Sequence, residues 1–135
     1  MEMEKIVIVV REDLPPAHAA NAAGVLGLAL GGRMEGSVAP DSPDASGALH
    51  AGLNPIPVPT LVAAARELQG LHRRAVETGL EVVGFNEVAR RSRTYPEYVD
   101  ALAGTEPDDI DYVAVIVGGP RSAVTKLTKR LALLK

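Results

Sequence analysis

The stretch "KIVIVVREDLPPAHAANAAG" at residues 5–24 joins an aliphatic run to a proline pair and a series of small residues. Residues 5–11 are apolar at both odd and even positions up to Arg11, which is typical of a strand buried on both faces of a sheet. The prolines suit the first turn of a helix, and the alanines and glycines after them allow a helix to pack close to a sheet. The stretch therefore predicts a buried strand followed by a covering helix.

Three further aliphatic runs indicate strands, at residues 56–62 ("IPVPTLV"), 80–85 ("LEVVGF") and 111–119 ("DYVAVIVGG"). The run at 56–62 is interrupted by prolines. Because Pro55, Pro57 and Pro59 lack amide donors, that strand can pair on one side at best, and we expect it at a sheet edge.

Helical patterns lie between and after these runs. Residues 16–31 and 63–78 predict two helices, and a closing amphipathic helix follows Pro120 with Val124, Leu127, Leu131 and Leu134 on one face. A short helix is expected near residues 96–102, and residues 36–47 predict a flexible loop rich in Gly, Ser and Pro. The alternation predicts one α/β domain over residues 1–135, a three-layer sandwich with a mixed four-stranded sheet and helices on both faces.

Composition excludes several classes of function. The 135 residues carry a net charge of −3, 3% aromatic residues and no cysteine, which rules out disulfides and thiolate chemistry and disfavours nucleic-acid binding. The acidic start and the short apolar run Ile6–Val10 predict no export and a cytoplasmic protein, and no apolar run is long enough to cross a bilayer. The three histidines lack metal-ligand spacing, so we expect no metal and no cofactor; His72, beside two arginines, is expected to be exposed.

The strand ends supply the best candidate binding site. Ligands of open α/β sheets bind beyond the carboxyl ends of parallel strands. If the strands at 5–11, 80–85 and 111–119 run parallel, their ends gather seven residues: Arg11, Asp13, Asn86, Glu87, Gly118, Gly119 and Arg121. The alternative is that strand ends become polar simply because the chain reaches water there. Asp13 in particular can serve as a helix cap instead.

Other polar residues have both a functional and a plain interpretation. His18 and His50 are candidates for a general acid or base, together with Asp13 and Glu87, but neither histidine has a visible nucleophile partner. The run "EVARRSR" at 87–93 would suit phosphate contacts, although such runs are usually solvated. The turn "VGGPRSAV" at 117–124 lacks the spacing of a phosphate-binding loop.

Three stretches resemble the type II peptidyl-tRNA hydrolases. "KIVIVVREDL…AANAAG" is similar to their first strand, Arg-x-Asp-Leu turn and small-residue helix, and "ELQGLHRRAVETGLEVVGF" to their penultimate helix and strand. "DYVAVIVGGPRSAVTKLTKRLALLK" is similar to their final strand, Gly-Pro turn and closing helix. The resemblance covers about two-thirds of the chain and implies the fold of that superfamily.

The residues that serve catalysis in those enzymes are largely replaced. Pro16 and Ala17 stand at their Gly-Lys pair, Asn21 stands at a helix Gln, and Asn86 and Glu87 lie nearest to their Asp-x-Gly turn. Arg11 and Asp13 carry over by position. The pattern most resembles a sister group of uncharacterised proteins, a domain of unknown function in the same superfamily.

Three hypotheses of function follow. The first is a protein without the catalytic lysine that binds a small molecule or partner at the strand-end cleft, where Arg11, Asn21, Asn86, Gly118, Gly119 and Arg121 are the candidate binding residues. The second is a hydrolase of peptidyl-tRNA or a related ester, with Asp13, Glu87 or a histidine in the missing roles; the acidic charge disfavours tRNA as a partner. The third is a homodimer or adaptor that uses the proline-rich strand or the small-residue helix as its interface.

Overall fold

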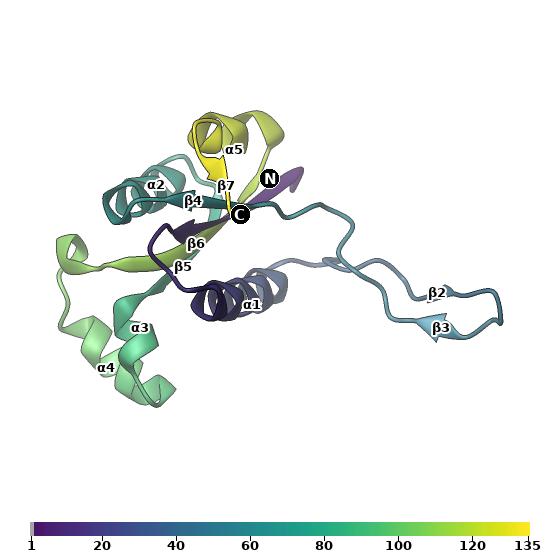
Figure 1. Ribbon diagram of the computed structural model, residues 1–135, viewed down its shortest axis with the longest axis horizontal. Coiled ribbons are helices and arrows are strands. Elements are labelled where there is room, and N and C mark those ends of the chain that lie inside the picture. The colour runs from purple at the N-terminus through teal and green to yellow at the C-terminus, as the bar shows by residue number, and fades with distance from the viewer. Residues whose placement is uncertain (1) are drawn as a thin grey trace.

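The structure is a computed structural model that describes residues 2–135 (Figure 1). In chain order its elements are β1 (Lys5–Arg11), α1 (Pro16–Arg33), β2 (Ser42–Pro43), β3 (Leu49–His50), β4 (Thr60–Ala63), α2 (Ala65–Glu77), β5 (Glu81–Asn86), α3 (Glu87–Arg91), α4 (Tyr95–Ala103), the 3-10 turn η1 (Pro107–Asp109), β6 (Tyr112–Gly119), α5 (Arg121–Thr128) and β7 (Ala132–Leu133). The observed α4 confirms the short helix predicted near residues 96–102. Within residues 2–135, no helix is both long and apolar enough to cross a membrane.

Strand β6 lies between β5 and β1 in the main sheet. All eight of its residues are buried, as expected for an aliphatic run that is apolar on both alternations. It pairs antiparallel with β1 on one side and with β5 on the other, and β1 pairs parallel with β4. The strand order is β5-β6-β1-β4-β7, so the sheet is mixed, as predicted, but has five strands rather than four.

The direction of β6 corrects one expectation. The strands at 5–11, 80–85 and 111–119 do not all run parallel, because β6 opposes both of its neighbours. Strands β1, β4 and β5 point the same way, and their carboxyl ends meet at one edge of the sheet. In the β1–β6 register Lys5 lies opposite Gly119, so the end of β6 lies at the other edge.

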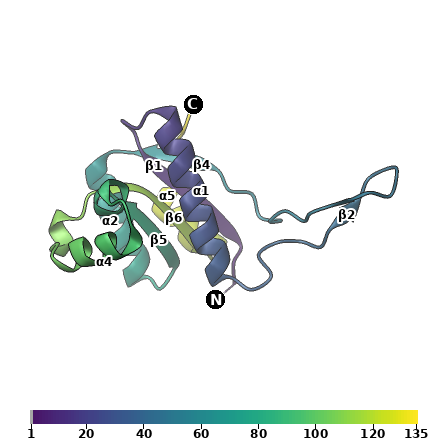
Figure 2. The same ribbon diagram turned by 90° about the horizontal axis from the view of Figure 1, so that it is seen from below.

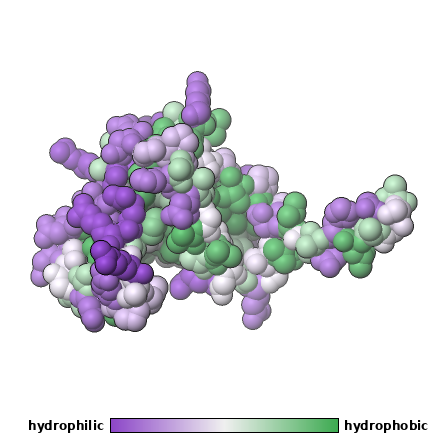
Figure 3. Space-filling view, turned by 60° about the horizontal axis from the view of Figure 1, so that its bottom comes forward, coloured by the Kyte–Doolittle hydropathy of each residue, from purple (hydrophilic) through white to green (hydrophobic). Residues whose placement is uncertain are grey.

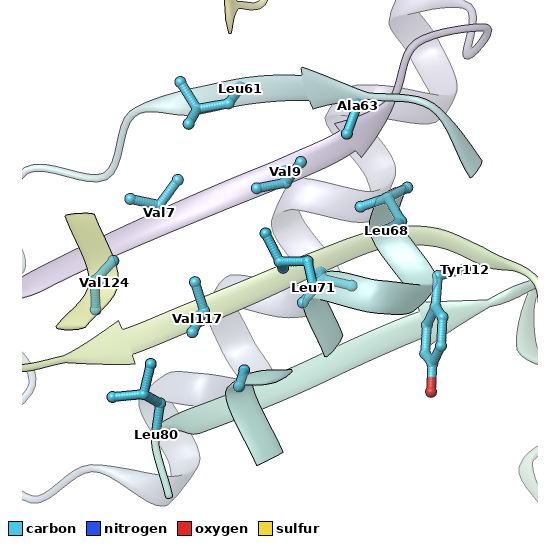
Figure 4. Packing of buried hydrophobic residues seen from close by; sticks show 12 residues of the cluster. Val7, Val9, Leu61, Ala63, Leu68, Leu71, Leu80, Tyr112, Val117 and Val124 are labelled. Carbon is cyan, nitrogen blue, oxygen red and sulfur yellow. The ribbon is translucent and has the colours of Figure 1, made fainter. Parts of the chain in front are cut away.

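Helices cover both faces of the sheet, which confirms the predicted α/β arrangement. Alternate residues of each strand face opposite ways. Helix α1 packs on one face, where its Leu26 and Leu30 meet Ile6, Ile8 and Ile116. Helices α2 and α5 pack on the other face, where the buried cluster shown in Figure 4 includes Val7, Val9, Leu61, Leu68, Leu71, Val115, Val117 and Val124. Burial of each such side chain contributes about 1.5–3 kcal/mol of transfer free energy.

The fifth strand replaces the end of the predicted closing helix. Helix α5 ends at Thr128, and β7 then pairs antiparallel with β4. The amide of Leu134 donates to the carbonyl of Thr60 at 2.9 Å, so β7 uses backbone groups of β4 that would otherwise face solvent. The prolines had predicted an edge strand. Instead, β4 lies inside the sheet, between β1 and β7. It begins at Thr60, directly after the last proline, where an amide donor is again available.

A long excursion, which we call the arm (residues 37–58), projects away from the body between α1 and β4 (Figures 1 and 2). The predicted loop at 36–47 lies partly within it, and the arm contains the small antiparallel hairpin β2–β3. At the hairpin turn, Asp44 accepts hydrogen bonds from the amides of Ser46 and Ala48 and pairs with His50. Nearer the body, the amide of Ala39 donates to the carbonyl of Leu53 at 2.9 Å, so the arm is a two-stranded structure along much of its length.

Candidate functional site

A polar depression lies where β1, β4 and β5 end. We call it the strand-end cleft. Its volume is about 460 Å³, and it is lined by Arg11, Glu12, Asp13, Ala65, Glu87, Arg90, Arg91 and Asp111. Its position follows from the topology, because the carboxyl ends of the three parallel strands meet there.

Glu87 is the central residue of the cleft. It is only 7% exposed, and two backbone hydrogen bonds fix the turn that carries it. The amide of Glu87 donates to the carbonyl of Asp111 at 2.8 Å, and the side-chain oxygen of Asn86 accepts from the amide of Ala89 at 2.9 Å as the N-terminal cap of α3. These bonds explain why the short α3 starts directly at the end of β5.

Three guanidinium groups surround the carboxylate of Glu87. Arg11 donates to Oε1 at 3.1 Å from the end of β1, and Arg90 donates to both oxygens at 3.0 Å from the next turn of α3. Arg91 lies 3.4 Å from Oε2. The hydrogen bond from Arg90, with a smaller contribution from Arg11, holds the pKa of Glu87 below its usual range despite burial, so the group is an anion at neutral pH.

Arg11 connects the two sides of the cleft. Its Nε donates to Asp13 at 2.6 Å, and its Nη1 lies 3.5 Å from Asp111 as well as contacting Glu87. The hydrogen bond from Arg11 lowers the pKa of Asp13. Since the side chain of Arg11 is 14% exposed, its charge is compensated by carboxylates rather than by water.

The lining residues suit binding better than covalent catalysis. The cleft combines three arginines with four carboxylates, and it contains no hydroxyl, thiol, imidazole or ammonium group among the residues that line it. A carboxylate works best as a general base when its pKa lies near the working pH. The pKa values of Asp13 and Glu87 are instead lowered, which moves them further from neutral pH.

The other residues predicted for the site lie elsewhere. Gly118 and Gly119 are at the opposite edge of the sheet, where the amide of Arg121 donates to Glu4 at 3.0 Å. The antiparallel direction of β6 is the reason. His18 and Asn21 lie exposed on α1 outside the cleft lining, and His50 lies on the arm, 2.8 Å from Asp44.

Sequence reasoning did not assign the remaining lining residues to the site. Arg90 and Arg91 were recognised only as part of the run at 87–93, and Asp111 only as the first residue of the predicted strand at 111–119. An antiparallel β6 would have indicated Asp111, because the residue that precedes an antiparallel strand lies at the edge where its neighbours end. Glu12 offers no signal beyond its place beside Arg11.

A second polar contact lies on α2, away from the cleft. The ring of His72 stacks on Tyr112 with centroids 4.5 Å apart, and the Tyr112 hydroxyl lies 3.2 Å from Nδ1. His72 is half-buried, not exposed as expected, and burial lowers its pKa. Within residues 2–135, no three His, Asp or Glu side chains are grouped as metal ligands.

Residues 4–135 match the family described as "Protein of unknown function (DUF2000)". The chain belongs to this family. The match covers nearly the whole chain and agrees with the predicted membership of a domain-of-unknown-function group. The link to type II peptidyl-tRNA hydrolases is finer than this match supports and remains a prediction. Among curated proteins, no relative of the chain is detected.

Among solved structures, a protein of unknown function from Agrobacterium tumefaciens strain C58 is similar to this DUF2000 chain. The two are 19% identical, the similarity covers 100% of each chain, and the TM-score is 0.89. The two chains therefore share the fold.

Proposed function

We propose that this DUF2000 protein binds a small polar molecule with an anionic group at the strand-end cleft. The observation that supports this function is that three guanidinium groups share a single carboxylate, that of Glu87. Arg90 and Arg91 share Glu87 with Arg11, and within residues 2–135 both make side-chain ion pairs with no other residue. A guanidinium has five N–H donors, so each keeps donors that can face a ligand.

The shape and charge of the cleft narrow the class of ligand. A volume of about 460 Å³ lies in the range of small-molecule sites. A carboxylate or phosphate would contact Arg90 and Arg91, which match such groups in geometry. Glu12 and Asp111 line the same cleft and can accept hydrogen bonds from an amine or hydroxyl. A molecule that carries both kinds of group fits best.

Calorimetric titration with inorganic phosphate, acetate and glycine as separate probes tests the proposal. We expect at least one probe to bind, and the variant with both Arg90→Gln and Arg91→Gln to bind it at least tenfold more weakly. Arg93→Gln is the matched control, because Arg93 is exposed and lies outside the lining. Absence of binding by all three probes, or equal affinity in the double variant, would contradict the proposal.

A hydrolase of peptidyl-tRNA or a related ester is the alternative, and the cleft supports it less well. Asp13 is already paired with Arg11 at 2.6 Å, and its lowered pKa makes it a weak general base. Turnover of peptidyl-tRNA that is abolished by Asp13→Asn would favour the hydrolase. If Asp13→Asn leaves the turnover of peptidyl-tRNA unchanged, the reaction does not take place in this cleft.

A further inference from the structure

The outer face of α1 is unusual for a surface that contacts water. Over the 18 residues of this helix, the last one, Arg33, is the only one with a permanent charge. Leu28 is nevertheless 82% exposed, and Val25 is 40% exposed. Residues 22–32 of the helix are apolar all around, and such a helix is normally covered on every side.

The arm presents apolar side chains in the same way. Val38, Leu49 and Leu53 are 60%, 69% and 79% exposed. Two carboxylates of the arm are already paired within it: Asp44 accepts from the turn amides, and Asp41 accepts from the amide of Gly52 at 3.1 Å.

An apolar groove of about 410 Å³ lies between these two features. It is bounded by α1, by one face of the sheet and by the base of the arm, and its apolar lining includes Leu30 of α1, Ile8 and Ile116 of the sheet, and Val38, Leu53 and Ile56 of the arm. Figure 3 shows hydrophobic surface in the middle of the body on this side and again along the arm. The groove adjoins both features, because Leu30 of α1 and Val38 and Leu53 of the arm line it.

We infer that this surface binds a second copy of the chain, with the arm of each copy lying along α1 and the groove of the other. One chain supplies both the projecting arm and the face that it fits, which is the self-complementarity that a twofold dimer requires. The lengths agree: α1 is about 27 Å long at 1.5 Å per residue. The arm reaches about 30 Å from its base to its turn at about 3.3 Å per residue.

Size and charge also favour a second copy. The arm and the outer positions of α1 together provide roughly the 20–30 residues a side of a standard interface. No Lys or Arg lies within residues 34–65, and α1 carries no acidic residue, so contact between arm and helix brings no like charges together.

Sedimentation velocity at protein concentrations from about 1 to 100 µM tests the dimer, because this range covers micromolar dissociation constants. We expect the wild-type protein to sediment as a species with twice the 14.1 kDa mass of one chain. Leu28→Lys and Leu53→Lys should each weaken association at least tenfold while far-UV circular dichroism stays unchanged. Val76→Lys is the matched control, because Val76 is 56% exposed on α2, which covers the opposite face of the sheet.

Crosslinking locates the contact independently. The chain has no cysteine, so a Leu28→Cys chain and a Leu53→Cys chain can be mixed and treated with a short bis-maleimide. A crosslinked pair that contains one chain of each kind supports the arm-to-helix contact. A wild-type chain that stays monomeric at 100 µM, or a dimer that Leu28→Lys and Leu53→Lys weaken no more than Val76→Lys does, would overturn the inference.

Discussion

Replacing Glu87 by Gln removes the negative charge at the centre of the strand-end cleft while keeping the side chain's shape. Arg11, whose side chain is 14% exposed, then loses its most buried partner and keeps only the more exposed Asp13 and Asp111. A hydrogen bond to a charged group contributes about 1.5–3 kcal/mol. The contacts of Arg90 and Arg91 contribute less, because these side chains are more exposed and water screens their charges. We therefore expect a loss of roughly 2–3 kcal/mol in the free energy of unfolding.

Urea unfolding followed by circular dichroism measures this loss as a lower midpoint at constant slope. For a chain of this length the melting temperature should fall by roughly 10 °C. Glu12→Gln is the matched control, because Glu12 is exposed, lines the same cleft and forms no ion pair within residues 2–135. Its effect should stay within about 0.5 kcal/mol.

The pH dependence provides a second test of the same reasoning. Because the folded pKa of Glu87 lies below its ordinary value of 4.5, its contribution is fully present above about pH 4.5 and is lost as the pH falls through the folded pKa. The difference between wild type and Glu87→Gln should therefore shrink in acid. Equal losses for Glu87→Gln and Glu12→Gln, or a difference that does not depend on pH, would refute the account of the cleft given above.

Three further predictions concern other parts of the molecule. Burial lowers the pKa of His72, so just below pH 6.5 the unfolded chain binds more protons than the folded chain does. The stability contributed by neutral His72 should therefore be lost as the pH falls from 6.5 toward the folded pKa. An NMR titration of His72 that gives a pKa above 6.5 would contradict this. Gly84→Ala should cost about 1–3 kcal/mol in urea unfolding, because the added methyl would overlap the Tyr112 ring. Gly52→Ala should disrupt the arm, where its methyl would collide with the carbonyl of Ala39, and so weaken the dimer at an unchanged circular dichroism signal from the body; an unchanged dimer would be the contrary result.

Much of the fold could be predicted because the buried strands have a strong local signal. The run at Lys5–Arg11 coincides with β1, and helices were expected close to where α1 and α2 lie. Strand direction had no such signal. Nothing local in the sequence of β6 distinguishes a parallel from an antiparallel partner, and this one choice moved Gly118, Gly119 and Arg121 to the far edge and brought Asp111 to the cleft.

The arm and β7 could not be predicted for a different reason. Leu131 and Leu134 have helical spacing, but the free backbone groups of β4 offer the chain hydrogen bonds that a longer helix could not reach. The arm is low in complexity and looks like an unstructured loop. Its order depends on a few local bonds around Asp44 and on the close approach of Gly52 to Ala39.

The position of β6 has a consequence for how the chain folds during synthesis. Its two neighbours, β1 and β5, are complete before β6 begins at Tyr112, so neither can reach its final pairing until more than 110 residues have been translated. Contacts between segments so far apart in sequence slow folding, and the waiting aliphatic strands are prone to aggregate. Nascent chains of this protein are therefore expected to depend on protection by the ribosome surface or a chaperone until β6 emerges.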